Sequence, residues 1–333
     1  MHPELFTLPF THLTVKTYGL MIVVGFLAAI YIIKRLSRPL NTNPELVSNA
    51  ALYALLAGLI GARLFYVVHY FDRFKGNLLS IFAIWQGGLE LLGGFVFAMA
   101  AIILFLKHHK LPVRHYLDII VIALLVTLGF GRIGCFAKGC CFGKPTDLSC
   151  GIRFPYGSDP YYSQVYPDPK RNRPEPRLQL PEDFFGYYYN EGKIYNGLKP
   201  FDALTDQQKK DVTTGPFRCL PIHPTQLYSS TEAFLLSLIL YVFWRRSKKA
   251  EFAKQCLLFT KPGSTFALLF ILYGTTRFFA EFLRDDNPFE YAWWMLYKSG
   301  TISQNLAIYM FIFGIIALAV LQKTKPEPLS FDS

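Results

Sequence analysis

The sequence predicts an all-α integral membrane protein with seven transmembrane helices and an extracytoplasmic head inserted between helices four and five. Three observations support this fold class. The 333 residues are 52% hydrophobic and 17% aromatic, which is too apolar for an ordinary soluble domain. The apolar residues form runs of about 20, the length that a helix needs to cross a bilayer. Lys and Arg gather at alternate ends of these runs.

Seven such runs are present, and the third is interrupted. They cover about residues 18–33, 47–68, 79–106, 116–134, 225–244, 264–283 and 302–321. The third run contains Gly87-Gly88 and Gly93-Gly94, so we expect its first half to be re-entrant or broken. Residues 1–333 are therefore expected to form a single polytopic membrane domain.

Basic residues predict the orientation of the chain. The loops after the first, third, fifth and seventh runs are basic, with Lys34 and Arg35, Lys107 and Lys110, Arg245 and Arg246, and Lys323 and Lys325. The opposite ends carry fewer, so by the positive-inside rule the N-terminus lies outside and the C-terminus lies in the cytoplasm. The same residues account for the net charge of +11, and no motif indicates a nucleic-acid partner.

Residues 144–222 form the expected head, which this topology places outside. The segment is polar, rich in Pro and Tyr, and contains no apolar run of spanning length. The cluster Tyr187-Tyr188-Tyr189 favours a packed surface over a disordered linker. Cys150 and Cys219 lie near the two ends of the segment. In an oxidising compartment they pair and close the head, and the alternative is two free thiols.

The segment 131–143, with the sequence GRIGCFAKGCCFG, is the centre of the expected functional site. Arg132 lies within or at the end of the fourth run. A lone guanidinium in hydrocarbon costs roughly 2.5–3.5 kcal/mol, so this side chain is expected to face a polar cavity. The four glycines of the segment fit a backbone that leaves the helix and packs closely against other segments or a ligand. The alternative is a snorkelling Arg at a helix end, followed by an ordinary loop.

Three spans each carry an arginine, and we expect these residues to form a phosphate site. Arg63 lies on the second span, Arg132 on the fourth and Arg277 on the sixth. Arg277 and Glu281 are spaced i, i+4, so they share a helix face and can pair, and Tyr273 lies one turn earlier on that face. Guanidinium groups bind phosphate in a bidentate manner. The alternative is a set of ion pairs that only fix helix packing.

The cysteines of the central segment are weighed separately. Cys135, Cys140 and Cys141 follow the spacing C-x4-C-C, which is not a recognised zinc spacing, and no His lies close in sequence. We favour small apolar packing for them over a metal or redox role. We therefore expect neither a metal nor an organic cofactor. His223, which opens the fifth span, either contacts the site or fixes the neighbouring loop.

Short motifs along the chain carry a resemblance. They are Tyr18-Gly19-Leu20-Met21, Gly61-Ala62-Arg63-Leu64-Phe65-Tyr66, Trp85-Gln86-Gly87-Gly88-Leu89 with Gly93-Gly94, Gly131-Arg132-Ile133-Gly134, His223-Pro224-Thr225-Gln226-Leu227-Tyr228, Tyr273-Gly274 with Arg277, Glu281, Phe282 and Arg284, and Ile302-Ser303-Gln304. Each is weak alone. Taken in order, from about residue 10 to residue 322, the set resembles the bacterial prolipoprotein diacylglyceryl transferase family.

The resemblance implies an enzyme and its substrates. The family transfers a diacylglyceryl group from phosphatidylglycerol to the lipobox cysteine thiol of a prolipoprotein signal peptide, and glycerol phosphate leaves. This is the first step of bacterial lipoprotein maturation, and it implies a multi-pass protein of the bacterial cytoplasmic (inner) membrane. One alternative is a catalytically weak or silent relative that binds phospholipid or lipoprotein precursor. Another is a small transporter, for which an internal repeat is expected and none is found.

The resemblance also implies roles for the matching residues. Arg132 and Arg277 are expected to be catalytic, because they would hold the phosphate and stabilise charge on the leaving group. The residues expected to bind substrate are Tyr18, Arg63, Gly93, Gly94, Cys135, Gly143, His223, Tyr273 and Glu281.

The chain departs from the family pattern in its acid–base residues. The family's His before the second glycine pair is Leu92 here, and the usual Asn and acidic residue of the signature are Cys135 and Cys140. Tyr228 is followed by Ser229 instead of the common Glu. The missing His matters most, because it is the obvious general base.

Glu90 is the candidate catalytic base in this sequence. It lies two positions before Leu92, and a carboxylate among apolar neighbours has a raised pKa and can accept a proton near neutral pH. The alternative is a structural pair between Glu90 and Arg63 or Arg132. A further alternative needs no protein base, because nearby arginines lower the pKa of the substrate thiol.

Overall fold

The computed structural model describes residues 4–7, 14–40, 44–83, 87–190, 193–253, 259–289 and 291–325. Within these residues six helices are long and apolar enough to cross a membrane, Thr17–Leu40, Ser48–His69, Val113–Lys138, Thr225–Glu251, Ser264–Leu283 and Ile302–Lys323. They coincide with six of the seven expected runs. The predicted class of a mostly helical, multi-pass membrane protein is therefore confirmed.

The third run is broken, as its glycine pairs predict. A 3-10 turn covers Leu78–Phe82, and helix α3 begins only at Leu91 and ends at His108. Gly87 and Gly88 have φ angles of +89° and +74°, in the left-handed region that favours glycine. The apolar part of α3, Leu92–His108, is shorter than the six helices above.

The chain divides into two compact units. The first unit contains residues 1–26, 125–240 and 267–317, and the second contains residues 27–124, 241–266 and 318–333. Five helices contribute residues to both units, namely α1 (Thr17–Ser37), α4 (Val113–Lys138), α7 (Thr225–Phe252), α8 (Ser264–Ala280) and α9 (Ile302–Lys323). A short hairpin of β1 (Glu4–Thr7) and β2 (Thr14–Lys16) precedes α1 in the first unit.

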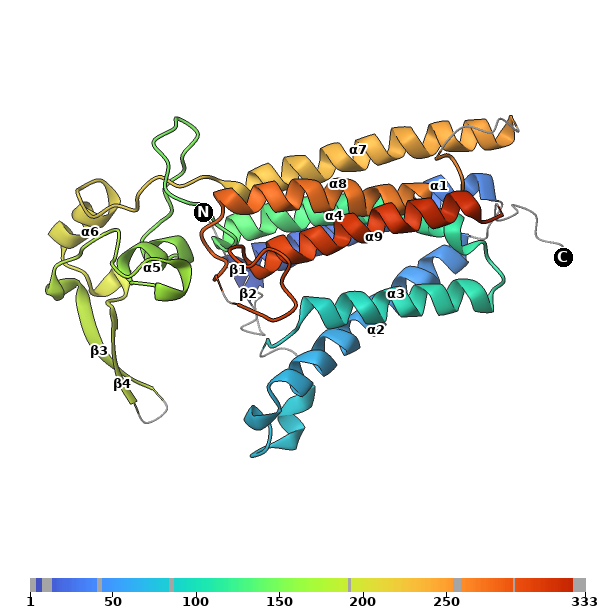
Figure 1. Ribbon diagram of the computed structural model, residues 1–333. Helices are drawn as coiled ribbons and strands as arrows, with labels where there is room; N and C mark the ends of the chain where they lie inside the picture. The colour runs from blue at the N-terminus through green and yellow to red at the C-terminus, as the bar shows by residue number, and fades with distance from the viewer. Residues whose placement is uncertain are drawn as a thin grey trace. The chain divides into compact units, whose positions relative to one another are not determined.

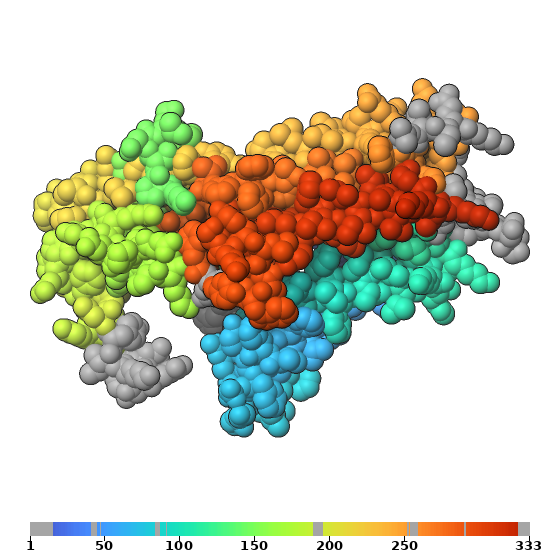
Figure 2. All heavy atoms as spheres, viewed as in Figure 1, coloured from blue at the N-terminus to red at the C-terminus, as the bar shows by residue number. Residues whose placement is uncertain are grey.

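Small residues let the helices of the first unit approach closely. A Cβ atom at Gly134 of α4 would lie 3.1 Å from the Tyr18 ring of α1, and one at Gly274 of α8 would lie 2.7 Å from a backbone oxygen of α9. In Figure 1 these parts of α8 and α9 run side by side. Helix α9 is drawn in red and part of its surface is open on the face shown in Figure 2. Its exposed apolar side chains include Phe313 and Ile316. Such a surface suits contact with lipid.

The segment between α4 and α7 folds around a core of its own. It contains α5 (Asp159–Val165), the antiparallel pair β3 (Phe185–Asn190) and β4 (Lys193–Leu198), and α6 (Asp206–Thr213), all labelled in Figure 1. Tyr161 and Phe184 are fully buried in this core. Cys150 and Cys219 are both free thiols, the first exposed and the second buried, so the alternative to a disulfide is the one observed.

The second unit contains α2 (Pro44–His69) and α3, which pack through glycines. Cβ atoms added at Gly93 and Gly94 of α3 would meet the carbonyl oxygens of Gly61 and Gly58 of α2, respectively. Small residues in this spacing allow two membrane helices to approach at backbone distance. Gly93 and Gly94, expected to bind substrate, therefore form a helix–helix contact.

Candidate active site

The segment 131–143, called the signature segment below, remains helical further along the chain than its glycines predict. Helix α4 continues to Lys138, so Gly131 and Gly134 lie inside it, and the expectation that they leave the helix was wrong. Gly134 instead allows the close approach of α1 at Tyr18. The helix ends at Gly139, whose φ angle of +89° turns the chain.

Arg132 is a partly buried cation without a direct partner. No hydrogen bond or ion pair joins its guanidinium to another residue in the part of the chain that the structure describes. Tyr273, Cys141 and Arg284 lie within electrostatic range of it. A buried guanidinium with unused N–H groups is suited to bind an anion.

Arg277 and Glu281 form the ion pair that their spacing predicts. Arg277 Nη1 lies 2.8 Å from Glu281 Oε2. Glu281 Oε1 also accepts hydrogen bonds from Asn287 Nδ2 at 2.5 Å and from Thr301 Oγ1 at 2.8 Å. Because this buried carboxylate is shared between Arg277 and the loop that leads to α9, it fixes where the guanidinium points.

Arg284 is a third arginine of this cluster. Its guanidinium binds Asp286 in a bidentate manner, with Nε–Oδ1 at 2.8 Å and Nη2–Oδ2 at 2.5 Å. Arg132 and Arg277 both lie within electrostatic range of it. Of the three guanidinium groups, Arg277 and Arg284 have carboxylate partners and Arg132 has none among the described residues.

A three-way backbone contact joins the ends of α4, α7 and α8. Gly143 forms an antiparallel bridge with Arg284, and the N–H of Lys144 donates to the carbonyl of Leu283. The N–H of His223 donates to the carbonyl of Lys144. A Cβ atom at Gly143 would lie 2.6 Å from the His223 carbonyl oxygen, so only glycine fits. Gly143 and His223 thus hold the loop that carries Arg284.

Glu232 is a neighbour of the arginines that the sequence motifs do not mark. It lies on α7, within electrostatic range of Arg277 and Arg132. Its Oε1 atom is buried and has no hydrogen-bond partner among the described residues. The signal that was available is the charge itself, since an ionisable residue inside an apolar run is a functional candidate by default.

Arg63 and Glu90 make structural contacts in the second unit. The Arg63 guanidinium donates to the carbonyls of Ser80, Ile81 and Gly87 at 2.7 Å and of Gly88 at 3.0 Å. Four backbone acceptors therefore occupy a side chain that was expected to bind substrate.

Glu90 differs from its expected surroundings. Its Oε1 lies 2.7 Å from His69 Nδ1, and the carboxylate side chain is 27% exposed. The alternative of a pair with Arg63 is not what the structure shows, because Arg63 donates to backbone carbonyls and Glu90 pairs with His69. The expectation that Glu90 is buried among apolar neighbours was wrong.

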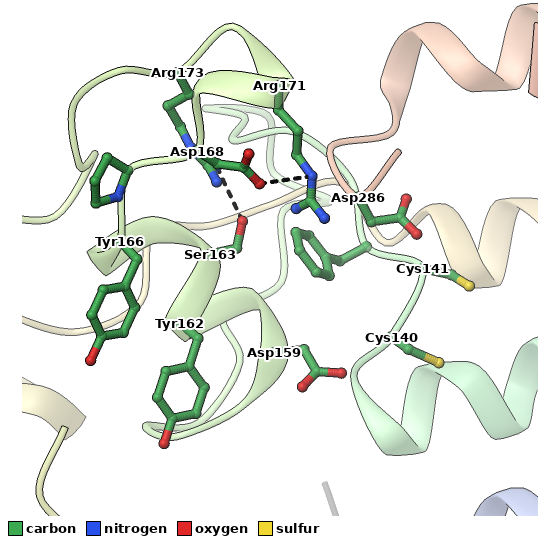
Figure 3. A pocket seen from close by; sticks show the side chains of 12 residues that line it. Cys140, Cys141, Asp159, Tyr162, Ser163, Tyr166, Asp168, Arg171, Arg173 and Asp286 are labelled. Carbon is green, nitrogen blue, oxygen red and sulfur yellow. Dashed lines mark hydrogen bonds and ion pairs between the residues drawn. The ribbon is translucent and has the colours of Figure 1, made fainter. Parts of the chain in front are cut away.

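The three cysteines come together at the end of α4. The sulfur atoms of Cys135, Cys140 and Cys141 all lie within 4.8 Å of one another. Cys140 and Cys141 line a cavity of about 570 Å³ whose other wall comes from the segment between α4 and α7. Figure 3 shows their sulfur atoms turned to the same side, away from Arg171 and Asp168 on the opposite wall of the cavity.

The opposite wall of this cavity is polar, and hydrogen bonds fix the position of its Arg173 side chain. Arg173 Nη1 donates to Asp285 Oδ2 at 3.0 Å and to Ser163 Oγ at 3.1 Å, the second bond being drawn in Figure 3. Burial lowers the pKa of Arg173 and raises that of Tyr166, both of which line the cavity. The cavity thus offers aromatic and charged groups beside the cysteines.

Comparison with known proteins identifies the family. Residues 3–320 match the family model described as prolipoprotein diacylglyceryl transferase. The chain belongs to the prolipoprotein diacylglyceryl transferase family. The membership that the ordered motifs suggested is therefore confirmed, and with it the class of membrane-bound transferases.

Similar proteins share nearly the full length of the chain. One from Clostridium tetani is 27% identical, over 96% of this chain and 98% of its own. One from Buchnera aphidicola is 28% identical, over 96% and 95%. One from Rhodospirillum rubrum is 27% identical, over 94% and 90%. All three are named phosphatidylglycerol–prolipoprotein diacylglyceryl transferase.

Proposed function

We propose that this protein transfers the diacylglyceryl group of phosphatidylglycerol to the lipobox cysteine thiol of a prolipoprotein. The observation that carries the proposal is Arg132, a partly buried guanidinium that has no ion-pair partner among the described residues and lies near Arg277 and Arg284. This arrangement suits one phosphate group better than a set of packing contacts, because packing contacts would pair each cation. Family membership supports the same substrate class.

The reaction is a displacement at carbon. The substrate thiolate attacks the glycerol carbon that bears the phosphate, the new S–C bond forms, and the C–O bond to the phosphate oxygen breaks. The electron pair stays on that oxygen, so glycerol phosphate leaves with added negative charge. Arg132 and Arg277 stabilise this charge as it develops. Glu281 is a positioning residue, since it orients Arg277 through their ion pair.

The remaining residues are assigned by what they contact. Tyr18 packs against Gly134 beside the cysteines, and Tyr273 lies within electrostatic range of Arg132 and Arg277, so we assign both to the substrate pocket. Gly143 and His223 hold the Arg284 loop. Arg63, Gly93 and Gly94 support the fold of the second unit.

Two carboxylates are candidates for accepting the thiol proton. We propose Glu90, which together with His69 forms a proton-accepting pair. Glu232 is the second candidate, because its unpartnered oxygen lies in the same unit as the arginines.

We also propose the topology that the basic loops predict. Helix α3 also crosses the membrane, which brings the number of spans to seven. The N-terminus is outside the bacterial inner membrane, and residues 144–222 form an extracytoplasmic head. A reporter that is active only in the cytoplasm should be active when fused after Ser333 and silent when inserted between Pro155 and Pro174. The reverse pattern would overturn this topology.

The transfer itself is tested with purified protein. A lipobox peptide incubated with the protein and phosphatidylglycerol vesicles should gain the mass of one diacylglyceryl group, and vesicles of phosphatidylcholine alone should give no gain. Arg218→Ala, which removes an exposed arginine outside the site, serves as the control variant and should transfer normally. Binding of the peptide and the lipid without any mass gain would favour a silent relative.

A further inference from the structure

The cysteine cluster has the dimensions of a metal site. Three thiolates around a tetrahedral zinc ion, with Zn–S bonds of about 2.3 Å, stand about 3.8 Å apart. The sulfur atoms of Cys135, Cys140 and Cys141 already lie within 4.8 Å of one another, so a small contraction closes the triangle. The spacing C-x4-C-C did not predict this arrangement, because it is the turn after α4 that brings the three together.

That turn is strained and held in place. Gly139 has a φ angle of +89° and Cys141 one of +59°, and a residue with a side chain in this left-handed region costs about 1–2 kcal/mol. The carbonyl of Cys140 accepts from Gln226 Nε2, and that of Cys141 from Thr225 Oγ1, both at 2.8 Å. Strain that the surrounding structure maintains is found at binding and catalytic sites, and here it directs thiols toward one point.

The charges near the cluster suit a thiolate-bound metal. One zinc ion with three thiolates carries a net charge of −1, and a fourth thiolate brings it to −2. Arg132 lies within electrostatic range of Cys135 and Cys141, and Arg284 within range of Cys141. These two guanidinium groups offset the negative charge. Soft sulfur ligands favour zinc over harder cations such as magnesium.

We propose that Cys135, Cys140 and Cys141 bind one zinc ion whose fourth position receives the thiol of the substrate cysteine. Among the described residues no further His, Cys, Asp or Glu joins the group, which leaves the three protein ligands and one free position that are typical of catalytic zinc sites. Cys140 and Cys141 line one edge of the cavity of Figure 3 and turn their sulfur atoms to the same side, and Arg132 and Arg284 lie within electrostatic range of Cys141.

The mechanistic half of this inference rests on the proposed transfer. The substrate thiol binds zinc and passes its proton to the carboxylate proposed above as the acceptor, because coordination to zinc lowers the pKa of a thiol enough to ionise it at neutral pH. The zinc-bound sulfur attacks the glycerol carbon, the C–O bond breaks, and its electron pair leaves on glycerol phosphate. No oxidation state changes, and the neutral thioether product is a weaker ligand that can depart. This activation compensates for Leu92 at the position of the family's His.

Metal content tests the site without reference to catalysis. Full-length protein, purified from cells grown with zinc and without chelators, should contain about one zinc per chain by mass spectrometry of the metal. The triple variant Cys135→Ser, Cys140→Ser, Cys141→Ser and the single variant Cys140→Ser should fall to background. Cys150→Ser, which changes an exposed thiol outside the cluster, should keep its zinc.

A cobalt probe on the wild-type protein keeps the test valid if the variants fail to fold. Zinc is removed by chelation and Co²⁺ is added, and a thiolate-to-cobalt absorption band should appear and should shift when a lipobox peptide is added. A Cys→Ser lipobox peptide should not shift it. Failure to bind zinc or cobalt overturns the site, and binding without a thiol-dependent shift overturns the free fourth position.

The outcomes also separate this inference from the proposed function. Transfer by a wild-type protein that contains no zinc would leave the transferase activity intact and overturn the metal site. Zinc and a thiol-dependent cobalt shift without lipid transfer would support the site and reject the activity. Where both hold, chelation should lower the transfer rate at least 10-fold, and added zinc should restore it.

Discussion

Arg63 and Arg132 are both arginines inside apolar helices, yet their surroundings differ. Arg63, in the second unit, donates to four backbone carbonyls and is 8% exposed. Arg132, in the first unit, makes no direct hydrogen bond or ion pair with the described residues. The sequence alone placed both in one expected phosphate site. The role of an intramembrane arginine therefore depends on its partners. An arginine whose N–H groups are all used by the protein supports the fold, and one with unused N–H groups is a candidate ligand-binding residue.

The largest expected effect is on catalysis at Arg132. Arg132→Ala should lower the transfer rate by about 100- to 1000-fold, the usual cost of removing one group that stabilises charge in a transition state. Arg132→Lys keeps the charge but loses the planar fork, so it should recover only part of the rate. Initial rates on phosphatidylglycerol vesicles measure both. Near-normal transfer by Arg132→Ala would remove the phosphate role and leave packing.

Substitution of Arg63 should lower the stability of the protein and not act directly on catalysis. Arg63→Ala leaves four backbone carbonyls without their donor, and we expect a loss of about 3 kcal/mol in the free energy of unfolding. Denaturation followed by the fluorescence of tryptophan in detergent measures it. If Arg63 bound the lipid phosphate, the variant would instead keep its stability and show a raised KM for phosphatidylglycerol.

Glu90 of the second unit and Glu232 of the first unit can be compared in the same way, as the two candidate acceptors of the thiol proton. Glu90→Gln should slow transfer about 100-fold at pH 7 if Glu90 accepts the thiol proton. The rate should recover above a pH of about 8.5, where the substrate thiol ionises unaided. Transfer rates measured from pH 6 to pH 10 for Glu90→Gln and Glu232→Gln decide between them. Recovery at high pH in Glu232→Gln, with unchanged activity in Glu90→Gln, would move the role to the first unit.

Glu281 should show the smallest effect among these residues. Glu281→Gln keeps the shape of the side chain but loses the charge that holds Arg277, and misplacing that guanidinium should lower kcat about 10-fold. KM for the lipid should change less than kcat. Glu281→Asp, which restores the charge on a shorter side chain, should recover part of the loss. A Glu281→Gln protein with unchanged kcat and a lower melting temperature would limit this residue to the fold.

Much of the fold follows from local sequence, and much of the site does not. Apolar run length locates the long helices, and the i, i+4 spacing gives the Arg277–Glu281 pair, because both depend on residues close in the chain. The broken third run follows from its glycines. The same reasoning failed at Gly134, which serves the approach of α1 and does not break α4.

Contacts between distant segments account for what the sequence could not predict. The carbonyls that accept from Arg63 belong to the 3-10 turn Leu78–Phe82 and to Gly87 and Gly88, and no periodicity in the sequence predicts that these two places meet one side chain. The cysteine cluster depends on a turn held by the start of α7. Glu232 lies outside the motifs, so the sequence offers only its charge inside an apolar run as a signal, and its position near Arg277 and Arg132 becomes visible only in the structure.

The β-bridge between Gly143 and Arg284 has a consequence for biosynthesis. It is joined to α7 by the hydrogen bond from the His223 N–H to the Lys144 carbonyl. The residues that it joins lie far apart in the sequence. A ribosome adds about 5–20 residues per second. Arg132 therefore enters the membrane several seconds before Arg277 and Arg284 have been translated. A nascent chain released before α8 carries the complete signature segment without the loop that completes the arginine cluster. Such a chain should insert into the membrane without holding a phospholipid headgroup, so lipid capture begins only once the last two helices have been made.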